Sequence, residues 1–490
     1  MTMEGRYASP MTPRGMDAAW QTDGEYCVTE PSAHLPAVLA HAEAGLDASL
    51  GRLFELVRIP SVSTDPAYKA ECLRCAEWLA ADLAGMGFDA SVRLTTGHPM
   101  VVAHDHSGEG PHVLFYGHYD VQPVDPLNLW NSDPFEPVLV PQPNGDTHIV
   151  ARGASDDKGA LFTFLEACRA WKDVTGKLPI RVSVLLEGEE ESGSPSLPAF
   201  LDAAAGELKA DVMLVCDTDM WDDETPAITT MLRGIVKEEF RVRCADRDLH
   251  SGIYGNAARN PIQVAADIIA SLRNPDGSVA LAGFYDGVKD LPPELAERWL
   301  KEPFDEAKFL GDIGLSIPAG EKRRTVLEQV WSRPSFDVSG ISGGYAGEGF
   351  KAVIPAEANV KLSFRLVEGQ DPAKIQKAFR DHVRAMIPPD CSVEFRNHGS
   401  SSATVMPVDS PLLRKALGAL KDEWGRSAIA GTGGSIPIAT VFQERLGMDS
   451  LLVGFARFDN RIHSPNEKYD LSSFRKGIRS WVRVLAAFAE

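Results

Sequence analysis

A histidine that could bind a metal ion, and a carboxylate that could orient this histidine, follow a short apolar segment of the sequence. The run from Val113 to Tyr116 predicts a buried strand, and after Gly117 come His118 and, two positions on, Asp120. A neutral imidazole is a good zinc ligand, and a carboxylate two residues away can hydrogen-bond its other nitrogen and fix the tautomer. His118 is therefore a candidate metal ligand and Asp120 the residue that orients it, although such a pair alone is more often a polar cluster.

Acidic residues and a further histidine recur at the ends of other predicted strands and beside a predicted helix. Four glutamates at the end of a buried strand repel one another unless a cation collects them. Two adjacent aspartates before Lys158 are more than a helix cap requires. A solvated acidic loop is the alternative for any one motif, but five together favour a single metal site. The motifs are His118-Tyr-Asp120, Ser155-Asp-Asp-Lys-Gly159, Glu187-Gly-Glu-Glu-Glu191, Asp217-Thr-Asp219 and Arg461-Ile-His463.

The elements that must position these side chains alternate between strand and helix patterns, which indicates an α/β fold. The carboxyl ends of parallel strands open into a crevice where such proteins bind ligands. A central, mostly parallel sheet would therefore bring His118 and the acidic residues together. Strands are predicted over 100–103, 113–116, 180–186, 212–216 and 451–455, and helices over 35–58, 66–86 and 160–171.

A second pattern interrupts the first between residues 232 and 402. Its predicted elements follow the order β-α-β-β-α-β, which is the ferredoxin-like plan, with a long insertion at about 275–330. One domain is thus inserted into another. We expect an N-terminal arm over 1–33, the first part of the α/β domain over 34–231, the inserted α+β domain over 232–402 and the second part of the α/β domain over 403–490.

Composition excludes several classes of function. The 490 residues exceed what one core usually holds, and the net charge of −20 argues against nucleic acid and against anionic membrane surfaces as partners. No apolar run has the length of a membrane span, and the first thirty residues lack a secretory signal pattern. The odd number of seven scattered cysteines fits free thiols in a reducing compartment. We therefore expect a cytoplasmic protein.

These motifs, taken in order, resemble those of a known enzyme family. From about residue 40 to the end, the chain is similar to the di-zinc metallopeptidases of the carnosinase-like dipeptidase group. More distant relatives are glutamate carboxypeptidase, acetylornithine deacetylase and succinyl-diaminopimelate desuccinylase. Besides the five motifs, the resemblance rests on Asp248-Leu-His-Ser-Gly252, Phe364-Arg-Leu-Val367, Gly433-Gly-Ser-Ile-Pro437 and His463-Ser-Pro-Asn-Glu467.

The resemblance implies a zinc-peptidase-like catalytic domain with two divalent metal ions, most simply zinc, although manganese or cobalt suits the same ligands. Asp156 would be the carboxylate that both ions share. Glu190 would be the general base and Asp120 would orient one of the histidines. The remaining ligands would be His118 and Asp217 on one ion and Glu191 and His463 on the other.

The resemblance also implies roles for the inserted domain as a lid and as a dimerisation surface. His250 would act in the active site of the neighbouring subunit by stabilising the oxyanion, so the enzyme would be a homodimer. Arg365 would hold the free carboxylate of the substrate, and Ser435 would lie in the same substrate-binding region. Relatives often have a cis peptide after the bridging acid, here between Asp156 and Asp157.

Several alternatives stay open at this stage. A slip of one residue within Glu189 to Glu191 would move both the base and the ligand, and Asp219 could replace Asp217. Relatives commonly carry Thr where this chain has Ala352, and Arg-Glu where it has Gly431 and Thr432. The residues at these positions would face the substrate, so the sequence does not determine which substrate side chains the enzyme accepts.

The predicted function is metal-dependent hydrolysis of the peptide bond in dipeptides or short peptides with a free C-terminal carboxylate. An N-acyl amino acid amidohydrolase is the near alternative. A non-catalytic binding protein is a remote one, because no ligand or base is missing. A separate structural metal site at His104 and His106 is less plausible than a surface strand, since no other ligand-type residue lies near them in sequence.

Overall fold

The computed structural model describes residues 31–490, so residues 1–30 of the predicted arm lie outside the described part. Residues 31–33, which the sequence pattern assigned to that arm, form the first turn of a helix. The helix predicted over 35–58 is two helices, α1 (Pro31–Ala44) and α2 (Leu46–Val57), because the chain breaks at Gly45. The next predicted helix is the short turn η1 (Pro66–Tyr68) followed by α3 (Lys69–Gly85).

A nine-stranded mixed sheet forms the larger part of the molecule, in the order β1-β2-β6-β3-β7-β17-β8-β15 with β16 beside β8. The four central strands β6, β3, β7 and β17 are parallel, as predicted, whereas both flanks contain antiparallel pairs. The strands are β1 (Asp89–Arg93), β2 (Met100–Asp105), β3 (His112–His118), β6 (Arg181–Glu187), β7 (Val212–Val215), β8 (Ala227–Leu232), β15 (Thr404–Val405), β16 (Ala428–Thr432) and β17 (Ser450–Gly454).

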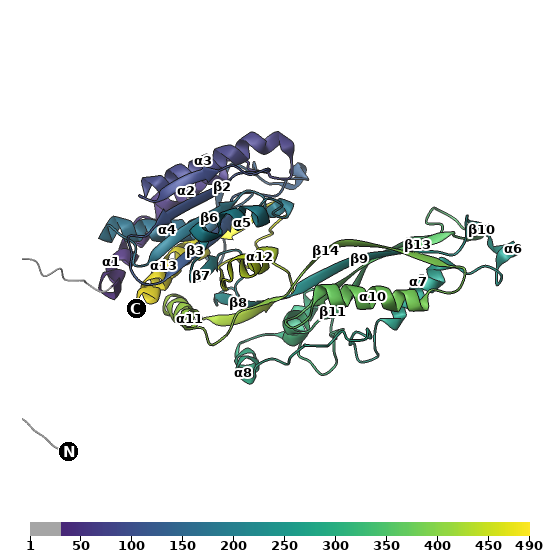
Figure 1. Cartoon of the computed structure of the whole chain (residues 1–490). Coiled ribbons are helices and arrows are strands. Elements are labelled where there is room, and N and C mark those ends of the chain that lie inside the picture. Colours follow the sequence, from purple (N-terminus) through teal and green to yellow (C-terminus); the bar gives the residue numbers. More distant parts are fainter. Residues whose placement is uncertain (1–30) are drawn as a thin grey trace, which may run out of the picture.

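Helices cover both faces of this sheet, because successive side chains of a strand point to opposite faces. Val113 and Phe115 of β3 pack in one hydrophobic core, and Leu114 and Tyr116 in the other. The first core also contains α1 to α3 with α4 (Lys158–Thr175), α11 (Pro411–Trp424) and α13 (Leu471–Ala489). The second contains α5 (Leu197–Leu208) and α12 (Pro437–Leu446). The three-layer arrangement is visible in Figure 1.

A separate antiparallel sheet follows the ferredoxin-like plan predicted from the sequence. Its strand order is β11-β13-β9-β14, with α7 (Pro261–Ser271) and α10 (Pro372–Met386) packed on it around a core of its own. Figure 1 shows this unit extending away from the nine-stranded sheet, with β10 (Leu249–His250) and α6 (Ser251–Tyr254) at its far end. Its strands are β9 (Gly234–Arg243), β11 (Ser335–Gly343), β13 (Glu357–Leu366) and β14 (Ser392–Ser401); β12 (Val353–Ile354) pairs with β10.

The predicted insertion folds back onto the nine-stranded sheet. It carries α8 (Pro293–Lys301), α9 (Glu306–Gly311) and a π-helical turn, η4 (Glu328–Ser332). The indole of Trp299 donates a hydrogen bond to the carbonyl of Ile429 at 2.9 Å, and that of Trp221 to the carbonyl of Pro303 at 3.0 Å. The insertion therefore connects the two sheets instead of extending freely from the smaller one.

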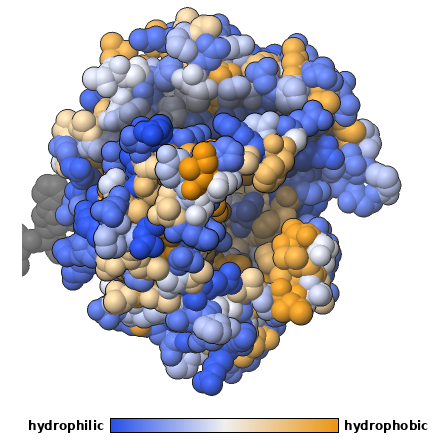
Figure 2. Space-filling model, turned by 90° about the vertical axis from the view of Figure 1, so that its right-hand side faces the viewer, coloured by the Kyte–Doolittle hydropathy of each residue, from blue (hydrophilic) through white to orange (hydrophobic). Residues whose placement is uncertain are grey.

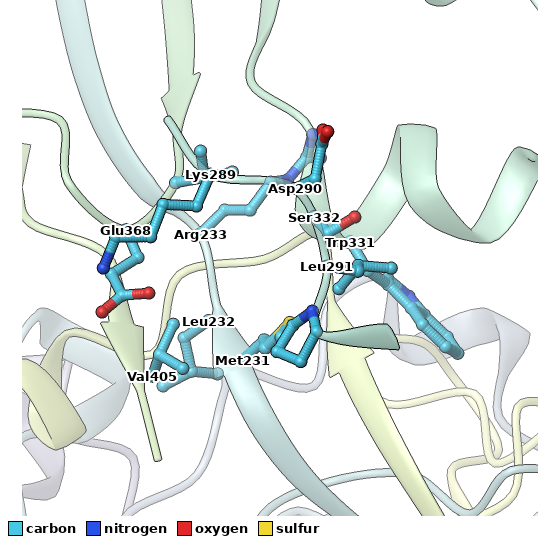
Figure 3. Close-up of a pocket in the computed structure, with 12 residues that line it drawn as sticks. Met231, Leu232, Arg233, Lys289, Asp290, Leu291, Trp331, Ser332, Glu368 and Val405 are labelled. Atoms are coloured by element: carbon cyan, nitrogen blue, oxygen red, sulfur yellow. The ribbon is translucent and has the colours of Figure 1, made fainter. Parts of the chain in front are cut away.

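A crevice marks the junction of the two sheets (Figure 3). Met231, Leu232 and Arg233 pass through it where β8 continues into β9, and Val405 lies beside them. Trp331 and Asp290 reach it from the insertion. None of the predicted metal ligands lines this crevice, so it belongs to the connection between the sheets and not to the candidate metal centre.

The remaining elements are small. A three-stranded sheet consists of β18 (Lys468–Asp470), β5 (Thr147–Val150) and β4 (Val138–Pro141), and it packs in the first core through Ile149 and Tyr469. Short turns occur at η2 (Leu127–Leu129) and η3 (Glu190–Ser192). Within residues 31–490, the structure contains no helix of the length and apolar character that spanning a bilayer requires.

Candidate metal centre and active site

Three parallel strands deliver the first residues of the site at one edge of the sheet. In β3 and β6, His118 is paired in register with Glu187, and β7 ends at Val215, just before Asp217. The loop before α4 supplies Asp156. Because parallel strands share the direction of their carboxyl ends, residues far apart in sequence converge here.

His118, Asp156 and Asp217 form the first of two groups whose ligand atoms all lie within 4.8 Å of one another. The Nε2 atom of His118 is 3.0 Å from Oδ1 of Asp156 and 3.9 Å from Oδ2 of Asp217. One imidazole nitrogen and two carboxylates are a donor set that suits zinc, manganese or cobalt.

The second group consists of Asp156, Glu191 and His463. The Nε2 atom of His463 is 2.9 Å from Oδ2 of Asp156 and 3.3 Å from Oε2 of Glu191. Asp156 thus turns one carboxylate oxygen to His118 and the other to His463, which is the arrangement of a carboxylate that bridges two ions. The peptide between Asp156 and Asp157 is cis, as the resemblance implied.

Asp120 holds the surroundings of the first group in two ways. Its Oδ1 is 3.4 Å from Nδ1 of His118, the nitrogen that faces away from Asp156. Its two oxygens also accept hydrogen bonds from the backbone N–H groups of Glu190 and Glu191, at 3.2 and 3.1 Å. Asp120 therefore connects the histidine to the η3 turn, a second contact that the sequence did not reveal.

The alternatives within the glutamate run differ in their surroundings. Glu189 turns away from both ligand groups, because its oxygens accept hydrogen bonds from the backbone N–H groups of His98 at 2.9 Å and Ser196 at 3.0 Å. Glu191 is in the second group, and Glu190 is its neighbour. At the end of β7 the structure brings Asp217, and not Asp219, into the first group.

The site accumulates negative charge that favours cations. Burial and the neighbouring Asp156 raise the pKa of Asp217 to about 8. Burial also raises the pKa of Glu190, with a contribution from Glu191. Hydrogen bonds to Asp156 and Glu191 raise the pKa of His463 to about 10. Carboxylates that crowd together in this way are relieved by bound cations, so the residues fit two divalent ions.

Two polar residues that the sequence did not single out hold the ligands in place. Buried Glu467 accepts hydrogen bonds from the backbone N–H groups of Ser155 at 2.9 Å and Asp156 at 3.0 Å. The side-chain amide of Gln122 donates to Oε2 of Glu191 at 2.7 Å. Glu467 ends the motif that begins at His463, and Gln122 follows Asp120 by two positions, but only the folded chain brings them to their partners.

Three further predicted residues lie outside both ligand groups. Arg365 of β13 donates from Nη1 to the Ser435 hydroxyl at 3.0 Å, so the two predicted substrate-binding residues lie together. His250 lies in β10 at the far end of the smaller sheet, and its Nδ1 accepts a hydrogen bond from the Gly252 N–H at 2.9 Å. Within one chain the structure does not bring His250 to the metal ligands (Figure 1).

The histidines outside the site have other partners. His104 contacts the hydroxyl of Ser183 at 2.7 Å through Nδ1 and a carboxylate oxygen of Glu207 at 3.2 Å through Nε2. His106 packs edge-on against the ring of His112, with 5.0 Å between centroids. Among the described residues, these histidines belong to no group of three ligand-type side chains, which favours the surface-strand interpretation.

An α/β sheet with two carboxylate–histidine groups that share one aspartate at its strand ends defines the class of binuclear metallohydrolases. Comparison with known proteins identifies the family. Residues 114–487 match the model of peptidase family M20/M25/M40, and the chain belongs to this family. It is therefore a metallopeptidase, in agreement with the resemblance seen in the sequence.

Individual relatives cover nearly the whole chain. A Cys-Gly metallodipeptidase, dug1 of Schizosaccharomyces pombe, is 29% identical over 461 residues, which are 90% of this chain and 96% of that protein. The Beta-Ala-His dipeptidase of Homo sapiens is 27% identical and covers 94% and 92% of the two chains. The M20 family metallo-carboxypeptidase Sso-CP2 of Sulfolobus solfataricus superposes with a TM-score of 0.78 at 29% identity, over 90% and 99%.

Proposed function

We propose that this protein hydrolyses the peptide bond of dipeptides or short peptides with a free C-terminal carboxylate. The observation that carries the proposal is the position of Asp156 between His118 and His463. Glu190 precedes Glu191 of the second ligand group in the chain. The names of its relatives, two dipeptidases and a carboxypeptidase, point to the same bond and to short substrates.

The catalytic roles follow from the chemistry of the side chains. Two divalent cations held by the ligand groups would lower the pKa of a water molecule and polarise the substrate carbonyl. Glu190 would accept a proton from the attacking water and deliver it to the leaving amine. Asp120 would keep the His118 imidazole in one tautomer and orientation, because its backbone carbonyl lies 3.1 Å from Nδ1 and its carboxylate 3.4 Å from the same nitrogen.

Substrate binding is assigned to Arg365 and Ser435. The guanidinium of Arg365 offers two parallel N–H donors, which match the geometry of a free carboxylate. Its hydrogen bond to Ser435 fixes one donor and leaves the others for the substrate. A substrate that lacks the carboxylate would lose this contact, so the proposal favours dipeptides over internal peptide bonds.

We propose a homodimer in which His250 of the partner subunit stabilises the oxyanion. In one chain His250 is exposed at the far end of the smaller sheet, where apolar side chains are exposed with it. Figure 2 views the molecule from that end and shows hydrophobic groups among mostly hydrophilic ones. Covering them with a second copy would remove apolar surface from water and bring His250 to another active site. These side chains are Ile253, Tyr254, Ile341, Tyr345 and Phe350.

Four further assignments stand as proposals. Zinc is the proposed metal, with manganese or cobalt as alternatives, because histidine and carboxylate ligands suit all three. The cytoplasm is the proposed compartment, since the cysteines described are free thiols. Neither nucleic acid nor a membrane is a proposed partner. The proposed domains are residues 34–231 and 403–490 for catalysis and 232–402 for the lid.

Two other functions lead to different experimental results. An N-acyl amino acid amidohydrolase would use the same metal centre on a substrate without a free amino group. A non-catalytic binding protein on the same fold would bind metal and peptide without turnover, although every proposed ligand and the base are present.

A substrate panel tests the proposal. Protein stripped with a chelator is assayed by mass spectrometry on dipeptides and N-acyl amino acids, with and without added zinc or manganese. We expect cleavage of dipeptides only after metal is restored. Cleavage restricted to N-acyl amino acids would favour the amidohydrolase, and metal binding without any cleavage would contradict hydrolysis of these substrates.

A further inference from the structure

A cavity of about 230 Å³ adjoins the candidate metal centre and is lined mainly by aromatic and aliphatic side chains. Asp217, a residue of the first ligand group, forms part of its wall, so the cavity begins where the reaction would take place. Its volume lies below the range of about 300–1,000 Å³ that is typical of whole-ligand pockets, so the cavity suits a part of a substrate, such as one side chain.

Part of the cavity wall comes from the insertion. Phe304 and Phe309 lie 5.4 Å apart between ring centroids, and Trp331 packs edge-on against Trp221 at 5.5 Å. Trp331 also packs against Trp299, whose indole is hydrogen-bonded to the backbone of β16. These contacts fix the aromatic wall to the catalytic sheet, so the cavity is preformed.

The absence of a side chain at position 431 makes room for this wall. A Cβ atom added to Gly431 would lie 2.8 Å from Cβ of Trp331, closer than real Cβ contacts allow. A larger residue there would therefore displace Trp331, and this chain has the cavity because it has glycine.

The charge of the residues around the cavity determines which end of a dipeptide binds there. Asp219 is exposed and lines the cavity, and it would attract an ammonium group and repel a carboxylate. The positive charge suited to the substrate carboxylate belongs to Arg365, which does not line this cavity. A dipeptide is thereby oriented with its amino-terminal residue at the cavity.

We infer that the cavity binds the side chain of the substrate's amino-terminal residue, and that this enzyme prefers dipeptides whose first residue is aromatic, with a free amino group beside Asp219. This inference rests on the proposed dipeptide hydrolysis and adds its substrate class. Glycine or alanine at the first position would leave the aromatic wall in contact with water, so the favourable free energy of burying this apolar surface would be lost.

The test compares Phe-Gly, Ala-Gly, Gly-Phe and N-acetyl-Phe-Gly as substrates of the metal-loaded full-length enzyme. We expect kcat/KM for Phe-Gly to exceed that for Ala-Gly by roughly 30-fold or more, since a whole aromatic side chain is buried. Gly-Phe and N-acetyl-Phe-Gly should both be poor substrates. A preference for Gly-Phe, or faster cleavage of the acetylated peptide, would overturn the assignment.

Exposed wall residues provide variants that should fold. Phe309 of the insertion and Phe458 of the catalytic domain line the cavity and are 40% and 73% exposed. Ile317, also on the insertion, is 78% exposed and does not line the cavity. Phe309→Ala and Phe458→Ala together should lower kcat/KM for Phe-Gly roughly tenfold and leave Ala-Gly within about twofold. Ile317→Ala should change neither.

The outcomes separate this inference from the proposed function. Metal-restored cleavage of Phe-Gly and Ala-Gly at equal efficiency, unaffected by the two alanine variants, would overturn the assignment of the cavity and leave dipeptide hydrolysis standing. If the metal-loaded enzyme cleaved none of the dipeptides, the proposed function would fail and the inference with it.

Discussion

The carboxylate of Glu467 accepts a hydrogen bond from the backbone N–H of Asp156 at 3.0 Å, although 311 positions separate the two residues in the chain. The other Glu467 oxygen accepts from Arg152 at 2.7 Å and from the Gly153 N–H at 3.0 Å. A residue from the second half of the catalytic fold thus fixes the loop that carries the shared metal ligand. Buried hydrogen-bonded carboxylates of this kind orient ligands without touching the ion.

Replacing Glu467 by glutamine should weaken metal binding without removing a ligand. One carboxylate oxygen becomes an amide nitrogen, which cannot accept from the N–H groups that face it. We expect roughly a 10- to 100-fold loss of metal affinity, measured by competition with a chelator. Glu444→Gln, at an exposed position of α12, is the matched control. Unchanged affinity in the Glu467 variant would show that the Asp156 loop holds its position unaided.

Neighbouring glutamates should give opposite results on mutation. Glu190→Gln removes the proposed base and should lower kcat by roughly 100- to 10,000-fold while two metal ions per chain remain bound. Glu191→Gln removes a ligand of the second group only, so about one ion per chain should be lost. Metal content by elemental analysis and kcat on a dipeptide distinguish the two. Activity close to wild type in Glu190→Gln would disprove its role as base.

Hybrid dimers test the shared active site. His250→Ala should lower hydrolysis and keep the metal content, because His250 lies outside both ligand groups. Mixed with Glu190→Gln after unfolding and refolding, it should regain roughly a quarter of wild-type activity, since half of random dimers are hybrids with one complete site. Each variant refolded alone is the control. No recovery in a mixture that analytical ultracentrifugation shows to be dimeric would contradict a site completed by the partner subunit.

The dependence of stability on pH should reveal a buried ion pair far from the active site. Burial opposes the charge of Glu166, but the hydrogen bond from Arg52 and the charge of Arg169 hold the pKa of Glu166 below its usual 4.5. A carboxyl with a lower pKa in the folded state stabilises the protein above its unfolded pKa, and this stabilisation is lost as the pH falls through the folded pKa.

Glu166→Gln should therefore destabilise the protein by about 1.5–3 kcal/mol above pH 5, because it removes the charged partner of Arg52 and one of the two carboxylates that pair with Arg169, the other being Asp82. The difference from wild type should shrink as the pH falls from 4.5 through the lowered pKa of the folded state, because the wild-type carboxyl then becomes neutral too. Urea unfolding of both proteins at a series of pH values on either side of 4.5 measures this difference in the free energy of unfolding. The control is Glu71→Gln, which breaks a more exposed ion pair with Arg74 and should lower the free energy of unfolding by at most about 1 kcal/mol. If the difference in stability between the Glu166 variant and wild type did not change with pH, the charge of Glu166 would be ruled out as the cause of that difference.

The sequence by itself determined the class of protein and predicted the residues of the two candidate ligand groups that the structure brings together. The apolar strand before His118 and the acidic residues after the other strands were visible because buried parallel strands are continuous apolar runs, and polar residues can appear only where they end. The six elements of the ferredoxin-like sheet were equally visible, because strand and helix differ in the period of their apolar residues.

Only the tertiary structure decided how distant segments meet. The flanks of the large sheet are antiparallel, which no local pattern records, because strand direction depends on pairing and not on composition. Glu467 and Gln122 acquire their roles through partners far away in the chain. From the sequence, the insertion was predicted only as an interruption of the smaller domain. In the structure Trp299 anchors it to the larger sheet, and Trp331 occupies the space beside Gly431, where a side chain is absent. Substrate choice depends on such contacts between segments, and a linear sequence does not contain their distances.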